Sequence, residues 1–332
     1  MKAEGFRLIL EEILNFQSVP GFGELNVSLE NCRKVLDTEN SDIRPRDREG
    51  RPGGLILLSD KPALLVPDLH ARRNFLGKIL NWTPPGFSLT VLELLENQEI
   101  QLVCLGDGFH SEARGRDRWF RAWDEYQGGF KRRDAMEAEM TEGLGVMMLV
   151  MELKATFPEN FHFLKGNHEN IANESLGGNR PFRKITSEGE MVLFWFQKVY
   201  PSETFQNYYH FEKSLPLFAL GDRFCALHCE PARHHSRNKI INARFHSGLV
   251  YDLNWTGNGE ARKNSVALYL EEYFPGDESS LIYGGHRPVS GYYALRAGDR
   301  FVQFHNPDLY IVAMPHRYFS GESTNYGITE VR

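Results

Sequence analysis

The chain has 332 residues, of which 41% are hydrophobic and 25% are charged, an ordinary composition for a globular protein. The net charge of -6 and the pI near 6.1 argue against a general nucleic-acid or membrane-surface binder, because both need a basic face. No apolar run approaches the roughly 18 residues of a membrane-spanning helix. We therefore expect neither a membrane nor a nucleic acid as partner.

The four cysteines point to a reducing compartment. Cys104 and Cys225 lie inside apolar runs, where a free cysteine packs like a small hydrophobic residue. Cys225 and Cys229 flank a candidate ligand, but no second thiol pair completes a thiolate zinc cluster. Because nothing resembles a secretion signal, we expect reduced thiols and a cytoplasmic protein.

Residues 1–60 form the first predicted unit, an N-terminal helix followed by a polar extension. Met1 to Phe16 has an amphipathic pattern that predicts a short packed helix. Glu39 to Gly54 is rich in Arg, Asp, Pro and Gly, which is typical of an irregular segment. We expect this unit to be an appendage or a lid rather than part of the core.

Residues 61–332 form the second predicted unit, in which short apolar runs alternate with polar loops and helical patterns. Such runs predict strands, and ligands of such sheets bind where strands end and loops begin. The predicted strands are Ala63–Val66, Gln101–Leu105, Phe161–Leu164, Arg223–Leu227, Leu281–Tyr283 and Phe301–Phe304.

An insertion at residues 112–145 interrupts this alternation. It is dense in charges and aromatic side chains, among them Trp119, Trp123 and Tyr126. Charges of both signs are typical of a solvated helical insertion. The alternative is a cap over the site that selects the substrate.

Five short polar motifs directly follow the apolar runs. They are Asp68-Leu-His70, Gly106-Asp107-Gly-Phe-His110, Gly166-Asn167-His168-Glu169, His228-Cys-Glu-Pro231 and Gly284-Gly285-His286-Arg287-Pro288. Each carries carboxylate, imidazole or amide groups that bind divalent cations. Asp-x-His alone is a weak signal, whereas five such motifs in order, each at a strand end, indicate a shared metal site.

A carboxylate such as Asp107 has two oxygens and can bridge two metal ions. Two ions about 3.5–4 Å apart bind both the attacking and the leaving oxygen of a phosphoryl transfer. They also lower the pKa of a bound water, which supplies a hydroxide nucleophile near neutral pH. The motifs therefore favour a phosphoester hydrolase.

Three stretches carry a family resemblance. The strongest is Phe157-Pro-Glu-Asn-Phe-His-Phe-Leu-Lys-Gly-Asn-His-Glu169, followed by Phe224-Cys-Ala-Leu-His-Cys-Glu-Pro231 and Phe304-His-Asn-Pro307. The chain resembles the calcineurin-like metallophosphoesterases, in the phosphoprotein phosphatase branch that includes the serine/threonine phosphatases. The resemblance runs from about Ala63 to Met314 outside the insertion. It implies an α/β fold with a central β-sandwich of mixed sheets, flanked by helices.

The resemblance also implies residue roles. Asp68, His70 and Asp107 would hold the first metal, and His168 would be the general acid or a hydrogen-bond donor to the leaving oxygen. The second metal would be held by Asp107, Asn167, His228 and His286. Both ions would be divalent Mn, Fe, Zn or Co, and we expect manganese in vitro.

The chain departs from the family pattern beside His168. His110-Ser111 stands where the family has an Asp-Arg pair that orients this histidine and holds phosphate. Glu230 lies near the predicted metals, where it would either repel a phosphate or replace the missing carboxylate. The sequence leaves this choice open.

Other side chains are candidates for supporting roles. Arg262, Arg287 and Arg233 are candidate phosphate contacts, since each lies near a ligand motif or near the family's second phosphate-binding arginine. His246 and His305 are candidate hydrogen-bond partners of the ligand imidazoles.

Three functions remain open at this point. The first is hydrolysis of a phosphomonoester, on a phosphoprotein or a small molecule, by metal-activated hydroxide. The second is hydrolysis of a dinucleoside polyphosphate or a phosphodiester, which the Gly-His-x-Pro-Val form at Gly285 to Val289 favours. The third is a catalytically impaired metal-binding interaction module, which His110-Ser111 favours. The sequence leaves the oligomeric state open.

Overall fold

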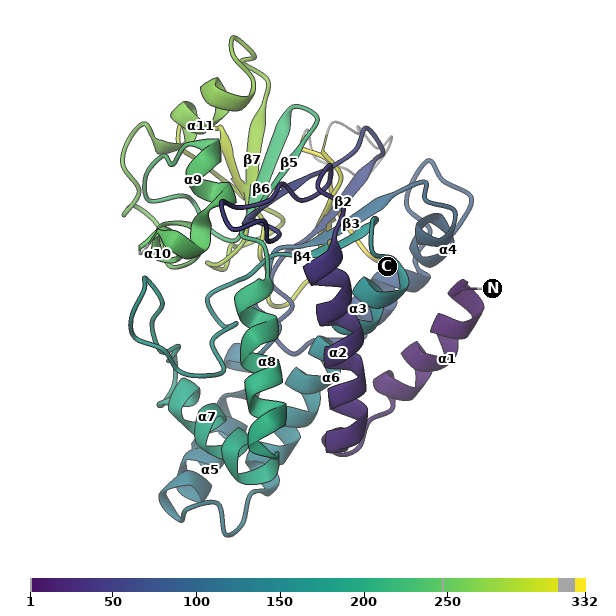
Figure 1. Cartoon of the computed structure of the whole chain (residues 1–332), viewed down its shortest axis with the longest axis vertical. Coiled ribbons are helices and arrows are strands. Elements are labelled where there is room, and N and C mark those ends of the chain that lie inside the picture. The colour runs from purple at the N-terminus through teal and green to yellow at the C-terminus, as the bar shows by residue number, and fades with distance from the viewer. Residues whose placement is uncertain (1, 247, 316–325) are drawn as a thin grey trace.

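The computed structural model describes residues 2–246, 248–315 and 326–332. In this part of the chain two mixed sheets lie face to face (Figure 1). The five-stranded sheet has the order β11-β10-β2-β3-β4, and its strands are Ile328–Glu330, Ile311–Ala313, Ala63–Val66, Gln101–Cys104 and Phe161–Phe163. The six-stranded sheet has the order β1-β5-β6-β7-β9-β8, and its strands are Leu55–Leu57, Phe218–Gly221, Phe224–Leu227, Leu281–Gly284, Phe301–Gln303 and Ala294–Arg296.

Alternate side chains of each inner strand enter different layers of the core, as the period of an extended chain requires. In β2, Leu65 packs between the two sheets, whereas Leu64 and Val66 pack against the helices. In β6, Ala226 faces the space between the sheets and Cys225 faces the helices of the other layer. The predicted strands are confirmed, and both faces of each sheet are covered.

Helices form the two outer layers (Figure 1). The larger layer consists of α1 Lys2–Leu14, α2 Phe22–Thr38, α3 Arg73–Asn81, α4 Val91–Glu96, α5 Arg116–Gln127, α6 Asp134–Thr156, α7 Glu188–Val199 and α8 Ser202–Ser214. The smaller layer consists of α9 Arg237–Ile241, α10 Leu249–Asn254 and α11 Ser265–Tyr273, and short 3-10 helices lie at Glu112–Gly115 and Ala243–Phe245. Helix α6 is buried over most of its length, which is why its Met-rich sequence is apolar nearly all round.

The parallel pairs decide where the site forms. Strand β3 pairs in parallel with β2 on one side and with β4 on the other. In the second sheet β7 likewise pairs in parallel with β6 and β9. The carboxyl ends of the neighbouring strands therefore share one edge in each sheet, where ligands of such sheets bind.

Residues 1–60 differ from the expectation of one helix with an extension outside the core. They contain two helices, and Phe6, Leu10, Leu25 and Leu29 are buried in the same cluster as α6. The position outside the core is therefore wrong for these helices, because their apolar faces cover α6. The division into two domains stays a prediction.

The segment predicted as an insertion contains η1, α5 and the first half of α6. Trp119 of α5 is buried, so the segment packs onto the core. Its role as a cap over the site stays a prediction. No helix among the described residues is long and apolar enough to cross a membrane, and the four cysteines are buried with free thiols.

A buried ionic network fixes the end of α2 to α6. The Glu39 carboxylate accepts from Arg44 Nη1 at 2.8 Å and from Lys154 Nζ. Burial opposes the ionisation of Glu39, but the charges of Lys154 and Arg44 outweigh it and lower its pKa to about 2. The stabilisation is therefore present above pH 4.5 and is lost as the pH falls through about 2.

We predict that Glu39→Gln lowers the free energy of unfolding at pH 7 by about 3 kcal/mol, because it leaves two buried cations without their carboxylate. Urea unfolding measures the difference. It should shrink as the pH falls from about 4.5 towards about 2, since the wild-type carboxylate then takes up a proton. Glu203→Gln, at an exposed position, is the control. A difference that does not change with pH would contradict this account.

Candidate active site

The six predicted ligands meet at the common edge of the two sheets. Asp68 and His70 follow β2, Asp107 follows β3, and Asn167 follows β4. His228 and His286 follow β6 and β7 of the other sheet. Five of the six residues are buried, and His286 is partly exposed.

The backbone at this edge is strained. His70, Asp107, His110, Glu112 and His286 all have positive φ angles, of 43°, 53°, 77°, 53° and 66°. Residues other than glycine adopt this conformation rarely, and each costs on the order of 1 kcal/mol. Such strain persists only where the surrounding contacts enforce it, and here it aims the side chains into the site.

The first group of side chains surrounds His70. The Nδ1 atom of His70 lies 3.2 Å from the carbonyl of Phe109, which leaves Nε2 directed into the site. This Nε2 lies 3.6 Å from Asp68 Oδ2 and 3.7 Å from Asp107 Oδ2. Asp68 also accepts a hydrogen bond from the backbone N–H of His286 at 3.0 Å, which joins the two sheets. A side chain on Gly285 would overlap the Asp68 carboxylate, so glycine is required there.

The second group surrounds Asn167. Its Oδ1 lies 3.0 Å from His228 Nε2 and 2.9 Å from His286 Nδ1. His228 Nε2 also lies 3.4 Å from Asp107 Oδ2. The same carboxylate oxygen of Asp107 therefore faces both groups.

The donor atoms of the second group are hydrogen-bond acceptors that face one another, an arrangement that a bound cation would stabilise. His228 donates Nδ1–H to the Leu105 carbonyl at 2.8 Å, so in the neutral ring Nε2 carries the lone pair. This lone pair faces two further acceptors, Asn167 Oδ1 and Asp107 Oδ2. Acceptors repel one another at such distances unless a positive charge lies between them. Imidazole, carboxylate and amide donors together suit the divalent ions of Mn, Fe, Zn or Co.

Protons supply that charge when no cation does. Burial opposes protonation of His70, but the carboxylates of Glu112, Asp68 and Asp107 outweigh it and raise its pKa to about 9. Burial raises the pKa of Asp107 to about 7, assisted by the charge of Asp68. Both shifts show that the site demands positive charge.

Glu169 holds the loops that carry these groups. Its buried carboxylate accepts from the backbone N–H groups of Asp107 at 2.9 Å, Gly108 at 2.8 Å and Gly166 at 2.6 Å. These bonds connect the loop after β3 to the loop after β4. None of these three contacts is with a cation. The three charge-assisted hydrogen bonds instead offset the cost of burying the Glu169 carboxylate.

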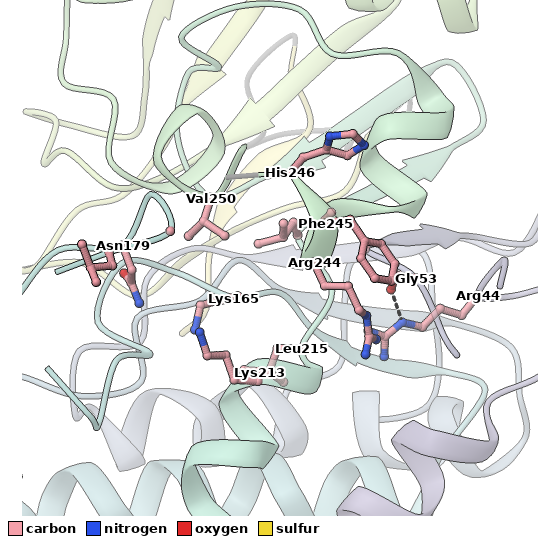
Figure 2. Close-up of a pocket in the computed structure, with 15 residues that line it drawn as sticks. Arg44, Gly53, Lys165, Asn179, Lys213, Leu215, Arg244, Phe245, His246 and Val250 are labelled. Carbon is pink, nitrogen blue, oxygen red and sulfur yellow. Dashed lines mark hydrogen bonds between the residues drawn. The ribbon is translucent and has the colours of Figure 1, made fainter. Parts of the chain in front are cut away.

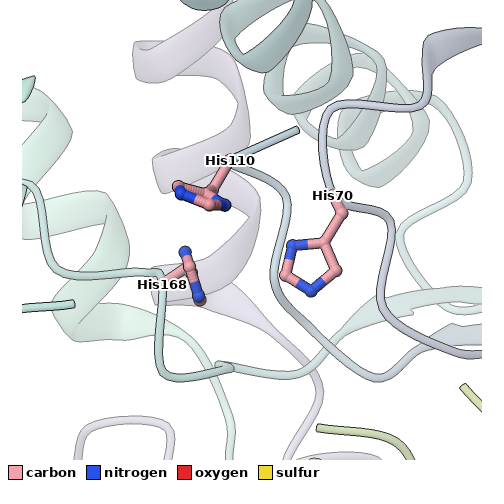
Figure 3. Close-up of side chains that lie close together, drawn as sticks. All are labelled: His70, His110 and His168. Atoms are coloured by element: carbon pink, nitrogen blue, oxygen red, sulfur yellow. The ribbon is translucent and has the colours of Figure 1, made fainter. Parts of the chain in front are cut away.

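His168 lies beside the first group (Figure 3). Its Nε2 is 3.9 Å from Asp107 Oδ2, and its ring packs against Phe182 with centroids 4.7 Å apart. Within the described residues its Nδ1 has no hydrogen-bond partner. Burial, with the neighbouring His70 and His110, holds its pKa well below the ordinary value. The ring is therefore neutral at pH 7.

His110 occupies the place of the expected aspartate and brings an imidazole where that aspartate would bring a carboxylate. Its Nδ1 accepts the backbone N–H of Glu112 at 3.1 Å, and its Nε2 lies 3.4 Å from Glu188 Oε1. Its ring stacks on Trp119, with centroids 4.9 Å apart. His110 also lies beside His168, with ring centroids 5.2 Å apart, and ligand atoms of His70, His110 and His168 lie within 4.8 Å of one another.

The candidate arginines lie outside the two groups of donor atoms. Arg233 and Arg262 line a separate cavity of about 390 Å³, and Arg233 donates to Asp252 Oδ2 at 2.6 Å. Arg287 is exposed and directly follows His286. Glu230 is partly buried, and burial raises its pKa. Whether any of these arginines binds phosphate stays a prediction.

Two acidic residues and one lysine at the site were missed by the sequence analysis: Glu169, Glu112 and Lys184. Glu112 Oε1 lies 3.4 Å from His70 Nε2, its Oε2 lies 3.1 Å from His305 Nε2, and Lys184 Nζ pairs with the carboxylate. Of the two histidines named as supporting partners, His305 lies at the site, whereas His246 lines another cavity.

That other cavity has a volume of about 520 Å³ and lies between the end of α8, which carries Lys213, and the segment of η2 and α10, which carries Arg244 and Val250 (Figure 2). Its lining includes four cationic side chains and none of the six predicted ligands. Three of the cations, Arg44, Lys213 and Arg244, pair with carboxylates of Glu39, Glu174 and Asp47, respectively. Their charge is thus largely neutralised within the protein.

Comparison with known proteins identifies the fold. No family model matches the sequence, and no curated protein matches it. A protein serine/threonine phosphatase from Saccharomyces cerevisiae superposes with a TM-score of 0.56 at 13% identity, over 93% of this chain and 88% of its own. A cold-active protein tyrosine phosphatase gives a TM-score of 0.42 at 13% identity, over 76% of this chain and 71% of its own.

The two-sheet arrangement is thus shared with the yeast serine/threonine phosphatase, which confirms the fold class that the resemblance implied. At this level of identity the likeness concerns the fold. The chemistry of the site rests on the residues described above.

We predict that Glu169→Gln lowers the free energy of unfolding by about 2–4 kcal/mol, because the amide loses a charge-assisted bond and turns an N–H towards a backbone N–H. Denaturant unfolding of metal-free protein measures it. Glu203→Gln again serves as the exposed control. An unchanged midpoint would mean that the two loops hold their positions without this carboxylate.

Proposed function

We propose that the protein is a dinuclear-metal phosphoesterase that hydrolyses a phosphomonoester. The observation that carries this proposal is the convergence of donor atoms from both sheets into two groups that share Asp107 Oδ2. In this proposal Asp68, His70 and Asp107 hold the first ion. The second ion is held by Asp107, Asn167, His228 and His286.

Two divalent ions at this position would act as Lewis acids on the phosphoryl group and would supply a hydroxide nucleophile near neutral pH. The protein's own part is to hold the donor atoms and to exclude water. The strained loops and the Glu169 carboxylate fix the donors before any ion arrives, which avoids reorganisation during the reaction. Burial of the donors keeps the local dielectric constant low, which strengthens their interaction with charge.

We propose His168 as the residue that acts on the leaving oxygen. It carries no orienting carboxylate, and its ring is neutral, so we assign it the role of hydrogen-bond donor rather than of a charged acid. Arg287 is our candidate for contact with the phosphate, because it is exposed beside His286. Arg233 already pairs with Asp252, and Arg262 shares its separate cavity, which weakens the case for both.

The fold shared with the yeast phosphatase supports a substrate class for the proposed activity. The yeast neighbour is a protein serine/threonine phosphatase, which supports a phosphomonoester, on a protein or a small molecule, as the substrate. A non-catalytic metal-binding module is the contrasting proposal, and it is favoured by His168 Nδ1, which has no hydrogen-bond partner among the described residues.

We predict that protein reconstituted with Mn²⁺ hydrolyses p-nitrophenyl phosphate at least about tenfold faster than the bis-ester, and that Asp107→Asn lowers the rate by about 100-fold or more. The variant keeps the shape of the side chain but removes the charge shared by the two groups. Release of p-nitrophenol measures both rates. Equal rates in the wild type and the variant would support the non-catalytic module, and faster turnover of the bis-ester would support a diesterase.

We predict that His168→Ala lowers kcat by about 100-fold or more but leaves the metal content unchanged, because this histidine donates to the leaving group and binds no ion. Elemental analysis of the purified variant accompanies the kinetics. His210→Ala, at an exposed position, is the matched control. Loss of metal from His168→Ala would show instead that this histidine is a ligand.

A further inference from the structure

His305 stands at the end of β9, in the same sheet as His228 and His286, and its side chain is fully buried. One of its ring nitrogens lies within 4.8 Å of the donor atoms of Asp68 and His70. Donor atoms about 2.1 Å from a common ion lie up to about 4.2 Å apart, so a small adjustment brings all three onto one ion.

The two nitrogens of His305 have different surroundings. Nε2 lies 3.1 Å from Glu112 Oε2, which is the distance of a hydrogen bond. Nδ1 is buried and has no hydrogen-bond partner in the described part of the protein. A buried nitrogen without a partner costs free energy unless a ligand satisfies it.

Glu112 is held firmly in the position that orients His305. It is buried, has a φ of 53°, and forms an ion pair with Lys184 from the segment before α7. Positive φ is strained for glutamate, so the loop keeps this conformation against its own preference. A metal-binding histidine usually coordinates the ion through one ring nitrogen and donates the N–H of the other nitrogen to a carboxylate.

We propose that His305 is a further ligand of the first metal ion, through Nδ1, and that Glu112 orients it. This inference rests on the metal site of the proposed function and extends it. The first ion then has four protein ligands, Asp68, His70, Asp107 and His305, as many as the second. A tetrahedral Zn²⁺ would be saturated there, whereas six-coordinate Mn²⁺ or Fe²⁺ would keep positions for water and substrate.

The test uses Co²⁺ as the probe, with the full-length protein stripped of metal beforehand. Calorimetric titration gives the number and affinity of the sites, and the visible absorption of bound Co²⁺ reports its coordination. We expect two sites in the wild type. Glu112→Gln should weaken one of them by about 10–100-fold and change its absorption, since it removes the support of the ligand. His305→Asn should weaken the same site at least as much, and His210→Asn should change neither site.

A second variant background shows which of the two ions His305 binds. In Asn167→Ala, which lacks a ligand of the second ion, His305→Asn should still weaken the remaining site. An effect that disappears in this background would place His305 on the second ion and overturn the proposal. If His305→Asn fails to fold, the Glu112→Gln variant tests the proposal instead, because glutamine is isosteric with glutamate and leaves the imidazole of His305 in place.

Two Co²⁺ sites with wild-type affinity and absorption in Glu112→Gln would also overturn the proposal, as would a wild type that binds no Co²⁺. The outcome is independent of turnover. A wild type that binds two ions and loses one with His305, yet hydrolyses no phosphoester, would overturn the proposed function while supporting this ligand.

Discussion

The arrangement of the site depends on one buried carboxylate, that of Glu169. Glu169 accepts hydrogen bonds from three backbone N–H groups of the loops after β3 and β4. These loops carry Asp107, which faces both groups of donor atoms, and Asn167, which faces the second group. The Glu169 carboxylate therefore fixes the distance between these two side chains. It satisfies backbone groups that tight, strained loops would otherwise leave without partners.

A second connection ties the two sheets together at the same edge. Arg72 is buried, and its guanidinium donates to the backbone carbonyls of Asp68, Leu69, Asn306, Pro307 and Leu309. The loop after β2 is thereby attached to the segment after β9. With its donors used in this way, Arg72 is part of the framework of the site and is not available to a phosphate.

The sequence predicted six of the described strands, β2, β3, β4, β6, β7 and β9, and placed the six candidate ligands directly after apolar runs. It did not predict β1, β5, β8, β10 and β11, which are short. It was insufficient for contacts that join distant loops. Glu112 follows the His110-Ser111 departure at the start of a short 3-10 helix, and nothing in its neighbours predicts a φ of 53° or a contact with His305. The second N-terminal helix was missed although Leu25, Leu29 and Leu36 recur at helical spacing, because polar residues between them obscured the pattern.

The division of the site between two sheets has a consequence for how the chain folds. Asp68 and the backbone of His286, which are joined by a hydrogen bond, lie 218 positions apart. The site therefore closes only after most of the chain has found its topology, and the unfolded chain offers no preformed set of ligands. An ion that binds there selects the native state and stabilises it by mass action. Under the proposed function, the supply of metal would then raise the fraction of the chain that is folded and its resistance to proteolysis.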